Sequence, residues 1–528
     1  MDLLLENGSV IDGAGNPAYP AAIGVEGDRV RVLRGDVSEV SAARRVDVRG
    51  KVVTPGFIDM HSHSGLMMLA DGRHEPKVRQ GVTTELIGID GCSYAPFTNR
   101  DDLLDFVDLN SGLDGRPDLA YDWDSVPSYL SRFDGRVSVN VAFVVGNSAL
   151  RIAAIGWDDV PASTSDIANM RAMLREAMEA GASGLSTGLD YPPGAYATTD
   201  ELAAISEEAA RAGGIYHTHV RYNLGDRFLD PFKEAIEIGR RSGTGVHLTH
   251  FYRRATYPGG AREMIDLVEG ARTEGLDVTF DCYPYEFSST RLTILLPQWL
   301  QEGGAKKTIA RLADPAQRDR IRGEIDHSNH WTDRGSVWAK TRIMYFHHPA
   351  NVKYEGRTIA EIADMREQHP ADAMCDLLVM ERLAVNEVGP GPEGATMPRF
   401  VAHPHGMIGT DSIFLGSHPS PRTYGSFPRI LGQFVRDEQL LSLEEAIRKM
   451  TSYPAQRLGL QDRGLLRDGM KADIVVFDPA TVRSLATYDE PKQFPVGIET
   501  VIVNGVVVVD DGGHTGATPG RAVGRGRG

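Results

Sequence analysis

The middle of the chain alternates short apolar segments with longer amphipathic ones, and this pattern constrains the fold most. The apolar segments predict strands at residues 84–89, 137–145, 184–186, 214–219, 245–249, 278–281 and 407–408. The intervening segments predict helices, clearest at residues 164–180, 200–212, 232–242, 260–274, 359–367, 370–379 and 443–451. Regular alternation favours an α/β fold with a parallel sheet. With about eight such units, a (β/α)8 TIM-like barrel is the leading prediction, and a doubly wound open sheet is the alternative.

Both ends of the chain are rich in short β-segments. They fall at residues 3–6, 22–26, 29–33, 45–47, 473–477 and 500–509, the last with an Asn504-Gly505 hairpin signal. Residues 1–54 and 467–528 are therefore expected to form one small β-domain around a catalytic domain at 55–466. Residues 286–350 fit no barrel unit and are expected to be an insertion, either a lid or an oligomer contact.

Bulk composition excludes several classes of protein. The net charge is −16, from 56 basic and 72 acidic residues, which argues against nucleic acids and anionic membranes as partners. The cysteines, Cys92, Cys282 and Cys375, are too few and too scattered for a disulfide framework. The N-terminus does not read as a signal peptide, and no segment has the length of a membrane span. A cytoplasmic protein with a small-molecule substrate is expected, and the Gly/Arg-rich residues 521–527 are expected to fray.

An apolar run after a Pro-Gly turn, residues 53–63, ends in His61 and His63. In a strand, residues two apart point to the same face, so both imidazoles can enter one pocket. Divalent metals such as zinc are commonly bound by imidazole nitrogens in this way. The pair therefore predicts a metal site at the end of the first barrel strand.

Further candidate ligands follow later strands. Asp90 and Cys92 end the second strand two residues apart, so either side chain could reach the metal, and Asp90 is preferred. His219 and His250 end two later strands, with His217 one pleat below the first and His247 facing away from the second. In a barrel, groups at the carboxyl ends of strands converge on one face, so these residues are expected to meet.

Asp411 follows a late strand, at the end of Gly406-Met-Ile-Gly-Thr-Asp. A carboxylate in this position can contact a metal and the water that the metal activates. It can remove a proton from that water and return it to a leaving amine, acting as general base and then as general acid.

These features together resemble the amidohydrolase superfamily and, more narrowly, the N-acyl-D-amino-acid deacylases, or D-aminoacylases. The resemblance covers essentially the whole chain. The most specific segments are Gly-Leu-Ser-Thr-Gly-Leu-Asp-Tyr-Pro-Pro-Gly at 184–194, Asp-Cys-Tyr-Pro-Tyr-Glu-Phe-Ser-Ser-Thr at 281–290 and Pro-Arg-Thr-Tyr-Gly-Ser-Phe-Pro-Arg at 421–429. The resemblance implies a distorted (β/α)8 barrel with a β-sandwich formed by both termini.

The same resemblance implies roles for individual residues. One or two zinc ions are expected, the first held by the strand-two ligand with His219 and His250, the second and weaker by His61, His63 and Asp411. Asp411 would be the catalytic acid and base. Arg422 would hold the substrate's α-carboxylate, and the substrate pocket would include Tyr191, Tyr283 and Ser289.

The chain departs from the family around this pocket. The family's second strand usually ends with a metal-binding cysteine, whose place is taken here by Asp90, while Cys92 comes two positions later. A lysine often follows the histidine that matches His250, whereas this chain has Phe251 and Tyr252. These changes affect the predicted substrate more than the predicted chemistry.

The leading hypothesis is a zinc-dependent amidohydrolase that cleaves the amide bond of an N-acyl-D-amino acid or a similar small acylated carboxylate. Tyr252 and Tyr222, which alter the pocket, motivate an alternative substrate: a cyclic amide, an ester or a natural-product amide. A non-catalytic assembly relative is the third option, and the retained ligand set argues against it. The sequence leaves the oligomeric state open, with a homo-oligomer as one option.

Overall fold

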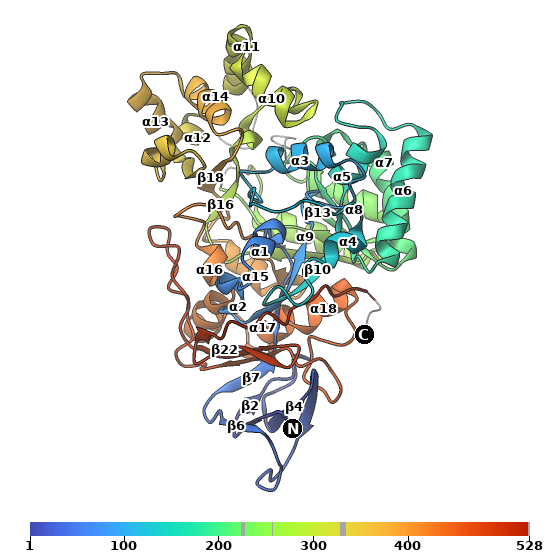
Figure 1. The fold of residues 1–528 in the computed structure, drawn as a ribbon, viewed down its shortest axis with the longest axis vertical. Coiled ribbons are helices and arrows are strands. Elements are labelled where there is room, and N and C mark those ends of the chain that lie inside the picture. The colour runs from blue at the N-terminus through green and yellow to red at the C-terminus, as the bar shows by residue number, and fades with distance from the viewer. Residues whose placement is uncertain (223–226, 256, 328–333, 526–528) are drawn as a thin grey trace.

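A closed ring of parallel strands forms the centre of the computed structural model (Figure 1), which describes all residues except 223–226, 256, 328–333 and 526–528. In the described residues the ring runs through β8 (Phe57–Asp59), β9 (Val82–Ile87), β10 (Asn140–Phe143), β11 (Val145–Gly146), β12 (Gly184–Gly188), β13 (Ile215–His219), β14 (Gly245–Leu248), β15 (Val278–Cys282) and β19 (Gly406–Ile408). Only Val144 separates β10 from β11, so the two continue one strand position. A parallel bridge between Ser62 and Ser412 joins the first and last strands. The predicted (β/α)8 barrel is therefore confirmed, and the open-sheet alternative is wrong.

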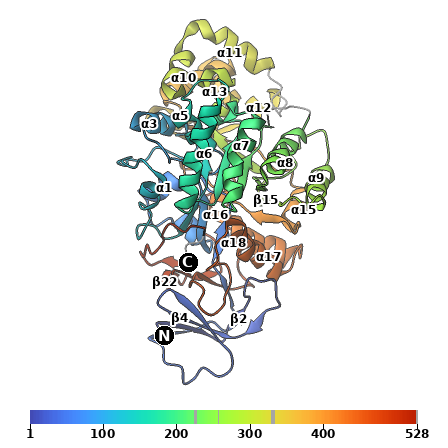
Figure 2. The same cartoon turned by 90° about the vertical axis from the view of Figure 1, so that its right-hand side faces the viewer.

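Helices cover the outside of the barrel, as the alternation predicts. They include α6 (Thr164–Glu179), α7 (Thr199–Arg211), α8 (Asp230–Ser242) and α9 (Ala261–Thr273). The side chains of Ser163 and Thr198 accept hydrogen bonds from the backbone of Asp166 and Glu201, so both predicted N-caps are present. Figure 2 shows α6 and α7 side by side on one flank of the barrel, where they pack against each other.

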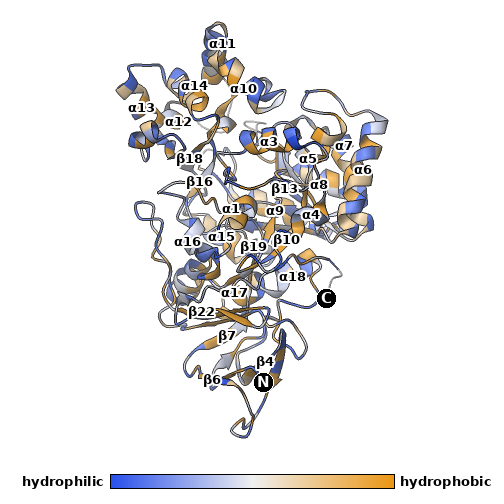
Figure 3. Cartoon of the chain, in the orientation of Figure 1, coloured by the Kyte–Doolittle hydropathy of each residue, from blue (hydrophilic) through white to orange (hydrophobic). Residues whose placement is uncertain are grey.

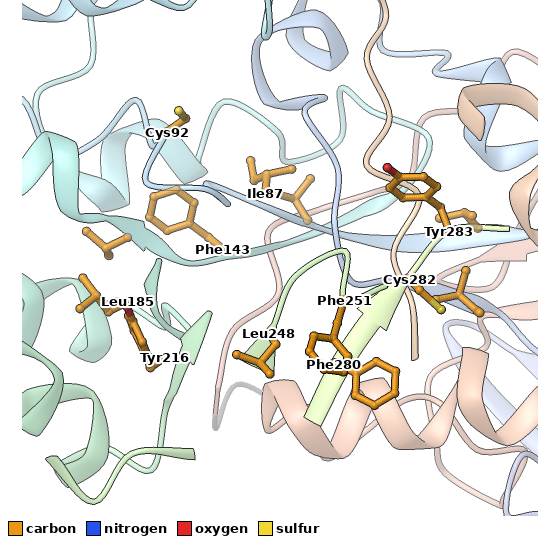
Figure 4. Close-up of a cluster of buried hydrophobic side chains, with 14 of the residues drawn as sticks. Ile87, Cys92, Phe143, Leu185, Tyr216, Leu248, Phe251, Phe280, Cys282 and Tyr283 are labelled. Carbon is orange, nitrogen blue, oxygen red and sulfur yellow. The ribbon is translucent and has the colours of Figure 1, made fainter. Parts of the chain in front are cut away.

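Apolar side chains from the strands and helices form one continuous core. Figure 4 shows part of it, with Ile87, Phe143, Leu185, Leu248 and Phe280 projecting from neighbouring strands. Each of these side chains is at most 1% exposed, and the same cluster takes in the buried faces of the surrounding helices. The outer helices alternate hydrophilic and hydrophobic positions, as α6 illustrates in Figure 3. Burial of these faces holds the helices on the barrel.

The two ends of the chain form a second, smaller core made of two sheets. One sheet comes from the N-terminal segment alone, in the order β5 (Arg29–Leu33), β4 (Ala22–Glu26), β1 (Leu3–Glu6) and β6 (Arg44–Asp47). In the other, β7 (Val52–Pro55) pairs with β20 (Ile474–Phe477), which pairs with β21 (Ile498–Val503) and, beyond it, β22 (Val506–Asp510). Apolar residues from both sheets pack together, among them Leu5, Ile23 and Ile474. The predicted β-sandwich formed by both termini is thus present.

The C-terminal tail runs along the barrel. Ala522 forms a parallel bridge with Val141, and the backbone of Val523 donates to the carbonyl of Val141 at 2.8 Å. The Arg525 guanidinium donates to the carbonyl of Ala212 at 3.1 Å. The prediction that residues 521–527 fray is therefore wrong for 521–525, because their backbone groups pair with strand β10 and its neighbours. The remaining residues of that prediction, 526 and 527, lie outside the described part of the chain.

A separate antiparallel sheet and its helices interrupt the barrel between β15 and β19. The sheet order is β16 (Phe287–Arg291), β18 (Val385–Pro390) and β17 (Arg342–Phe346). The helices are α10 (Gly304–Ala313), α11 (Pro315–His327), α12 (Arg334–Lys340), α13 (Ile359–Arg366) and α14 (Pro370–Met380), and they share a core of their own. We infer that this inserted subdomain extends from 287 to 390, further than the expected 286–350. Two helices that were assigned to the barrel pattern, near 359–367 and 370–379, pack in it instead.

The inserted subdomain and the β-sandwich lie at opposite ends of the molecule in both views (Figures 1 and 2). The barrel lies between them. Among the described helices, none is long and apolar enough to cross a membrane.

Candidate metal centre and active site

His61 and His63 lie directly after β8, where the chain leaves the barrel wall. Their side chains are 0% and 4% exposed. The His61 backbone amide donates to Asp59 at 3.1 Å, and its carbonyl accepts from the Asp411 amide at 2.8 Å. The second bond ties the first strand to the last and brings the predicted acid next to the predicted histidine pair.

Asp90 lies at the centre of the imidazole cluster. Its Oδ2 is 3.4 Å from His61 Nε2, 3.6 Å from His63 Nε2, 3.6 Å from His219 Nδ1 and 3.8 Å from His250 Nε2. Burial raises the pKa of Asp90, but the charge of His61 and hydrogen bonds from the imidazoles outweigh it and hold the pKa well below its usual value. The structure thus brings together five predicted ligands from four different strands.

Cys92, the alternative to Asp90, has another contact. Its Sγ lies 3.4 Å from Asn110 Oδ1, and burial raises the pKa of the thiol well above its usual value. A neutral thiol that donates to an amide is a poor metal ligand, because metals bind the thiolate. Of the two residues, Asp90 is the one that faces the imidazoles.

Asp411 links the candidate metal ligands to an arginine. Its Oδ1 lies 3.5 Å from His61 Nε2 and 3.4 Å from His63 Nε2, and its Oδ2 lies 3.0 Å from Arg422 Nη1. Burial raises the pKa of Asp411, but the charges of Arg422 and His61 prevail and lower it to about 2. The side chain is therefore a carboxylate across the neutral pH range.

Three of these residues adopt a backbone conformation that is uncommon outside glycine. The φ angles of Asp90, His250 and Asp411 are 53°, 34° and 49°. Left-handed backbone in such residues persists only where the surrounding structure enforces it, and it concentrates at functional sites. For His250 the enforcing contact is a hydrogen bond from its amide to Asp281 at 2.8 Å.

The donor set fits a divalent metal. Ligand atoms of His61, Asp90 and His250 lie within 4.8 Å of one another, as do those of His61, His63 and Asp411. Ligands about 2.0–2.1 Å from zinc at tetrahedral angles lie about 3.4 Å apart, close to the distances around Asp90. In addition, both ring nitrogens of His61 and Oδ1 of Asp90 are buried with no hydrogen-bond partner among the described residues. Buried polar atoms are almost always satisfied, so these atoms indicate an absent partner.

Two carboxylates and a tyrosine contact the ring nitrogens of His63, His219 and His250 that do not face Asp90. Asp114 Oδ1 is 2.7 Å from His63 Nδ1, and Asp190 Oδ2 is 3.1 Å from His219 Nε2. The Tyr222 hydroxyl is 3.0 Å from His250 Nδ1. Metal-binding histidines usually have such partners, which fix the ring and its tautomer. The sequence analysis missed both aspartates: Asp190 lies in a segment quoted only for its family resemblance, and Asp114 follows a helix with no motif of its own.

A second group of acidic and imidazole side chains adjoins the first and shares His61 with it. Asp281 Oδ2 is 3.1 Å from His247 Nε2, 3.6 Å from His61 Nδ1 and 3.9 Å from His217 Nε2. His61, His217 and Asp281 form a further set whose ligand atoms lie within 4.8 Å. Burial lowers the pKa of both His217 and His247. The sequence analysis placed these two histidines away from the main ligands but gave Asp281 no role, although it ends a barrel strand.

A cavity opens over this group of candidate metal ligands. Four of the predicted pocket residues line it: Tyr191, Tyr252, Tyr283 and Ser289. Among the lining residues that were not predicted, two carry ionisable side chains, Arg254 and Glu387. Among the described residues, Arg254 is the arginine that lines the cavity. Arg422, which was predicted to bind the substrate's carboxylate, does not line it.

Arg422 lies next to this wall. Its guanidinium carbon is 4.4 Å from the centre of the Tyr283 ring, and its Nη2 donates to the Ser289 carbonyl at 3.1 Å. The Tyr283 and Tyr252 hydroxyls are 2.8 Å apart. The Arg254 guanidinium lies 5.3 Å from the centre of the Tyr252 ring. Two guanidinium groups therefore border the tyrosine pair, and the carboxylate-binding role predicted for Arg422 stays a prediction.

Comparison with known proteins agrees with this geometry. A family model described as "Amidohydrolase family" matches residues 44–509, most of the chain. The chain belongs to the amidohydrolase family. A D-aminoacylase of Alcaligenes xylosoxydans xylosoxydans is 35% identical over 99% of this chain and 98% of that protein. N-acyl-D-glutamate deacylase from the same organism is 35% identical over 96% of this chain and 93% of that protein.

Solved structures of this amidohydrolase's relatives extend the comparison. A D-aminoacylase structure with a binuclear metal centre has a TM-score of 0.82 and 33% identity, covering 99% of this chain and 100% of that one. N-acyl-D-glutamate deacylase from Bordetella bronchiseptica has a TM-score of 0.82 and 30% identity, with 99% of both chains covered. That enzyme was solved with zinc and a phosphonate inhibitor that mimics the tetrahedral intermediate. The family resemblance and the barrel predicted from sequence are confirmed.

Proposed function

We propose that this protein hydrolyses the amide bond of N-acyl-D-amino acids or similar small acylated carboxylates. The observation that carries the proposal is the position of Asp90 and Asp411 among four buried imidazoles, next to a cavity whose wall includes Arg254. The deacylase relatives, similar over nearly the whole chain, support the same reaction and a D-amino-acid product.

Zinc is the proposed cofactor, as one ion or two. Asp90, His219 and His250 would hold one ion, and His61 with Asp411 would reach a second. When bound, such an ion polarises the amide carbonyl and lowers the pKa of water. The relative solved with zinc supports this choice of metal.

Asp411 is the proposed general base and acid. One carboxylate oxygen faces His61 and His63, so it lies where an attacking water would be deprotonated. The low pKa keeps Asp411 in the basic form at neutral pH. After it has accepted the proton, Asp411 can transfer it to the departing amine, because the same oxygen borders the reaction site.

The two arginines are the proposed source of positive charge for the substrate's carboxylate. Arg254 lines the cavity, while Arg422 is held between Asp411 and Ser289. A guanidinium binds a carboxylate with two parallel hydrogen bonds, which would also fix the α-carbon relative to Asp411. The amino-acid half of the substrate would then lie beside Tyr283 and Ser289.

Activity on a substrate panel tests the proposal. Zinc-loaded protein should hydrolyse N-acetyl-D-amino acids, with the L-enantiomers as the control series. Asp411→Asn should lower kcat by about 100-fold or more, the usual contribution of a general acid and base. If Asp411→Asn kept its activity with metal bound, the assigned role would be wrong.

A cyclic amide, an ester or a natural-product amide is the second candidate substrate class. Tyr222 contacts His250, and Tyr252 lines the cavity next to Phe251, which occupies the position where the resemblance would favour a lysine. Inactivity on all simple N-acyl amino acids with metal fully bound would favour this class. A homo-oligomer remains a prediction, and the free, buried cysteines are compatible with the predicted cytoplasmic location.

A further inference from the structure

Glu387 is a buried carboxyl group on the wall of the substrate cavity. It lies in strand β18 of the inserted subdomain, is 6% exposed and lines the cavity. Within the described part of the chain, its carboxyl group has no hydrogen-bond or ion-pair partner, although Arg254 and Arg422 are close enough to affect its charge. A carboxyl group on a cavity wall that no protein group pairs with is free to hydrogen-bond a ligand bound in the cavity.

The neighbours of Glu387 make a polar strip on the same face of the sheet. Glu387 pairs with Thr290 in the antiparallel register of β16 and β18, and Ser288 pairs with Gly389. Residues directly opposite each other in such a pair share one face. Ser288, Thr290 and Glu387 all line the cavity, and the Thr290 hydroxyl is held 2.8 Å from the Tyr191 hydroxyl.

This strip borders the half of the substrate that contains the amine. Arg422 contacts Asp411 with one nitrogen and the Ser289 carbonyl of β16 with another. If the α-carboxylate is drawn to the arginines, the α-carbon and its side chain lie against β16 and β18. The acyl group must then extend away from the inserted sheet, because the scissile amide lies between the two halves.

Burial determines the protonation of Glu387. It raises the pKa of Glu387 to about 8, against the opposing charges of Arg422 and Arg254. At pH 7 the group is therefore mainly a neutral carboxylic acid, with one hydrogen to donate and a carbonyl oxygen to accept. A primary carboxamide offers the complementary pair, an N–H donor and a carbonyl acceptor, so it can satisfy both at once. An ionised carboxylate has no donor, and an alkyl group has neither.

We propose that Glu387 determines substrate specificity by pairing with a primary carboxamide on the D-amino-acid side chain. The favoured substrates are then N-acyl derivatives of D-glutamine or D-asparagine. This inference rests on the proposed deacylase function and adds the side-chain class to it.

Steady-state kinetics on three substrates test the inference: N-acetyl-D-glutamine, N-acetyl-D-glutamate and N-acetyl-D-leucine. For the zinc-loaded protein at pH 7, kcat/KM for the glutamine derivative should exceed that for the glutamate derivative by about tenfold or more, since unpaired buried groups are strongly selected against. Glu387→Leu should lower kcat/KM for the glutamine derivative by about tenfold while changing that for the leucine derivative by less than about threefold. Glu387→Gln keeps a donor and an acceptor, so it should retain most of the preference.

The matched control is Glu286→Gln, because Glu286 is an exposed acid just before the same strand and does not line the cavity. It should leave all three rates unchanged. Circular dichroism and zinc content of each variant separate loss of specificity from loss of folding.

Two results would overturn the inference while leaving the proposed function intact. One is a wild-type enzyme that deacylates D-amino acids but prefers the glutamate derivative. The other is a Glu387→Leu variant, folded and zinc-loaded, whose ratio of glutamine to leucine activity equals that of wild type. If no N-acyl-D-amino acid is hydrolysed by the zinc-loaded wild type, the proposed function itself fails and the inference with it.

Discussion

Lys77 is a fully buried lysine whose removal should destabilise the barrel more than an average substitution. Its ammonium group, 0% exposed, pairs with Asp59 and lies 3.6 Å from Glu85. It also donates to the Thr410 hydroxyl at 2.7 Å, next to Asp411, the proposed general base. Asp59 in turn accepts the backbone amides of His61 and Thr410, at 3.1 and 2.9 Å. The lysine therefore neutralises two buried acids, of which Asp59 bridges the first and last barrel strands.

Lys77→Met leaves Asp59 buried without its cation. It also removes one of the two cationic neighbours of Glu85, the other being His74 at 3.0 Å. At an effective dielectric constant of about 20, attraction between unit charges 3.6 Å apart amounts to about 5 kcal/mol. Measured losses from breaking buried pairs are about 3–5 kcal/mol. We therefore expect Lys77→Met to lower the free energy of unfolding by about 3–5 kcal/mol, beyond the usual range of about 0.5–3 kcal/mol for single substitutions.

Urea unfolding followed by far-UV circular dichroism measures this loss. Lys492→Met, at an exposed lysine, is the control and should change the free energy of unfolding by less than about 0.5 kcal/mol. Adding Asp59→Asn to Lys77→Met should recover part of the loss, because the amide removes one uncompensated charge and still accepts the backbone hydrogen bonds. If Lys77→Met unfolds within about 1 kcal/mol of wild type, the assigned role of the buried pair is refuted.

Two further predictions concern buried titratable groups. Glu387 has a folded-state pKa of about 8 against its ordinary value of 4.5, so between these pH values the folded state keeps a proton that the unfolded state has lost. Stability should therefore fall by up to about 1.4 kcal/mol per pH unit across this window, and Glu387→Gln should remove that fall; equal pH profiles of urea unfolding for the two proteins would contradict it. Burial raises the pKa of the thiols of Cys282 and Cys375 to about 12 and that of Cys92 well above its usual value. Native protein at pH 8 should thus react with Ellman's reagent at none of its three thiols within minutes, and at all three after denaturation; rapid reaction of the native protein would show that a cysteine is accessible.

Much of the site followed from the sequence because strand ends in a barrel converge. His61, His63, His219 and His250 each end a strand or closely follow one. The alternation of side chains along a strand and the convergence of strand ends in a barrel were therefore enough to place them in one pocket. Asp90 was preferred over Cys92, and the structure places its carboxylate 3.4–3.8 Å from nitrogen atoms of four imidazoles.

The parts that the sequence did not reveal depend on contacts between distant segments. Strands β16, β17 and β18 are short and separated by about 40 to 50 residues, so no local hairpin signal joins them. The helices α13 and α14 have the same local pattern as barrel helices, and only tertiary packing assigns them to the inserted core. Glu387 was missed for this reason, since its place on the cavity wall comes from the pairing of β16 with β18.

The position of bound zinc in a crystal tests the central claim most directly. Anomalous diffraction at the zinc absorption edge should show an ion about 2.0–2.2 Å from ligand atoms of Asp90, His219 and His250. An ion coordinated by Cys92 instead of Asp90, or no ion among these imidazoles in zinc-loaded crystals, would contradict the account.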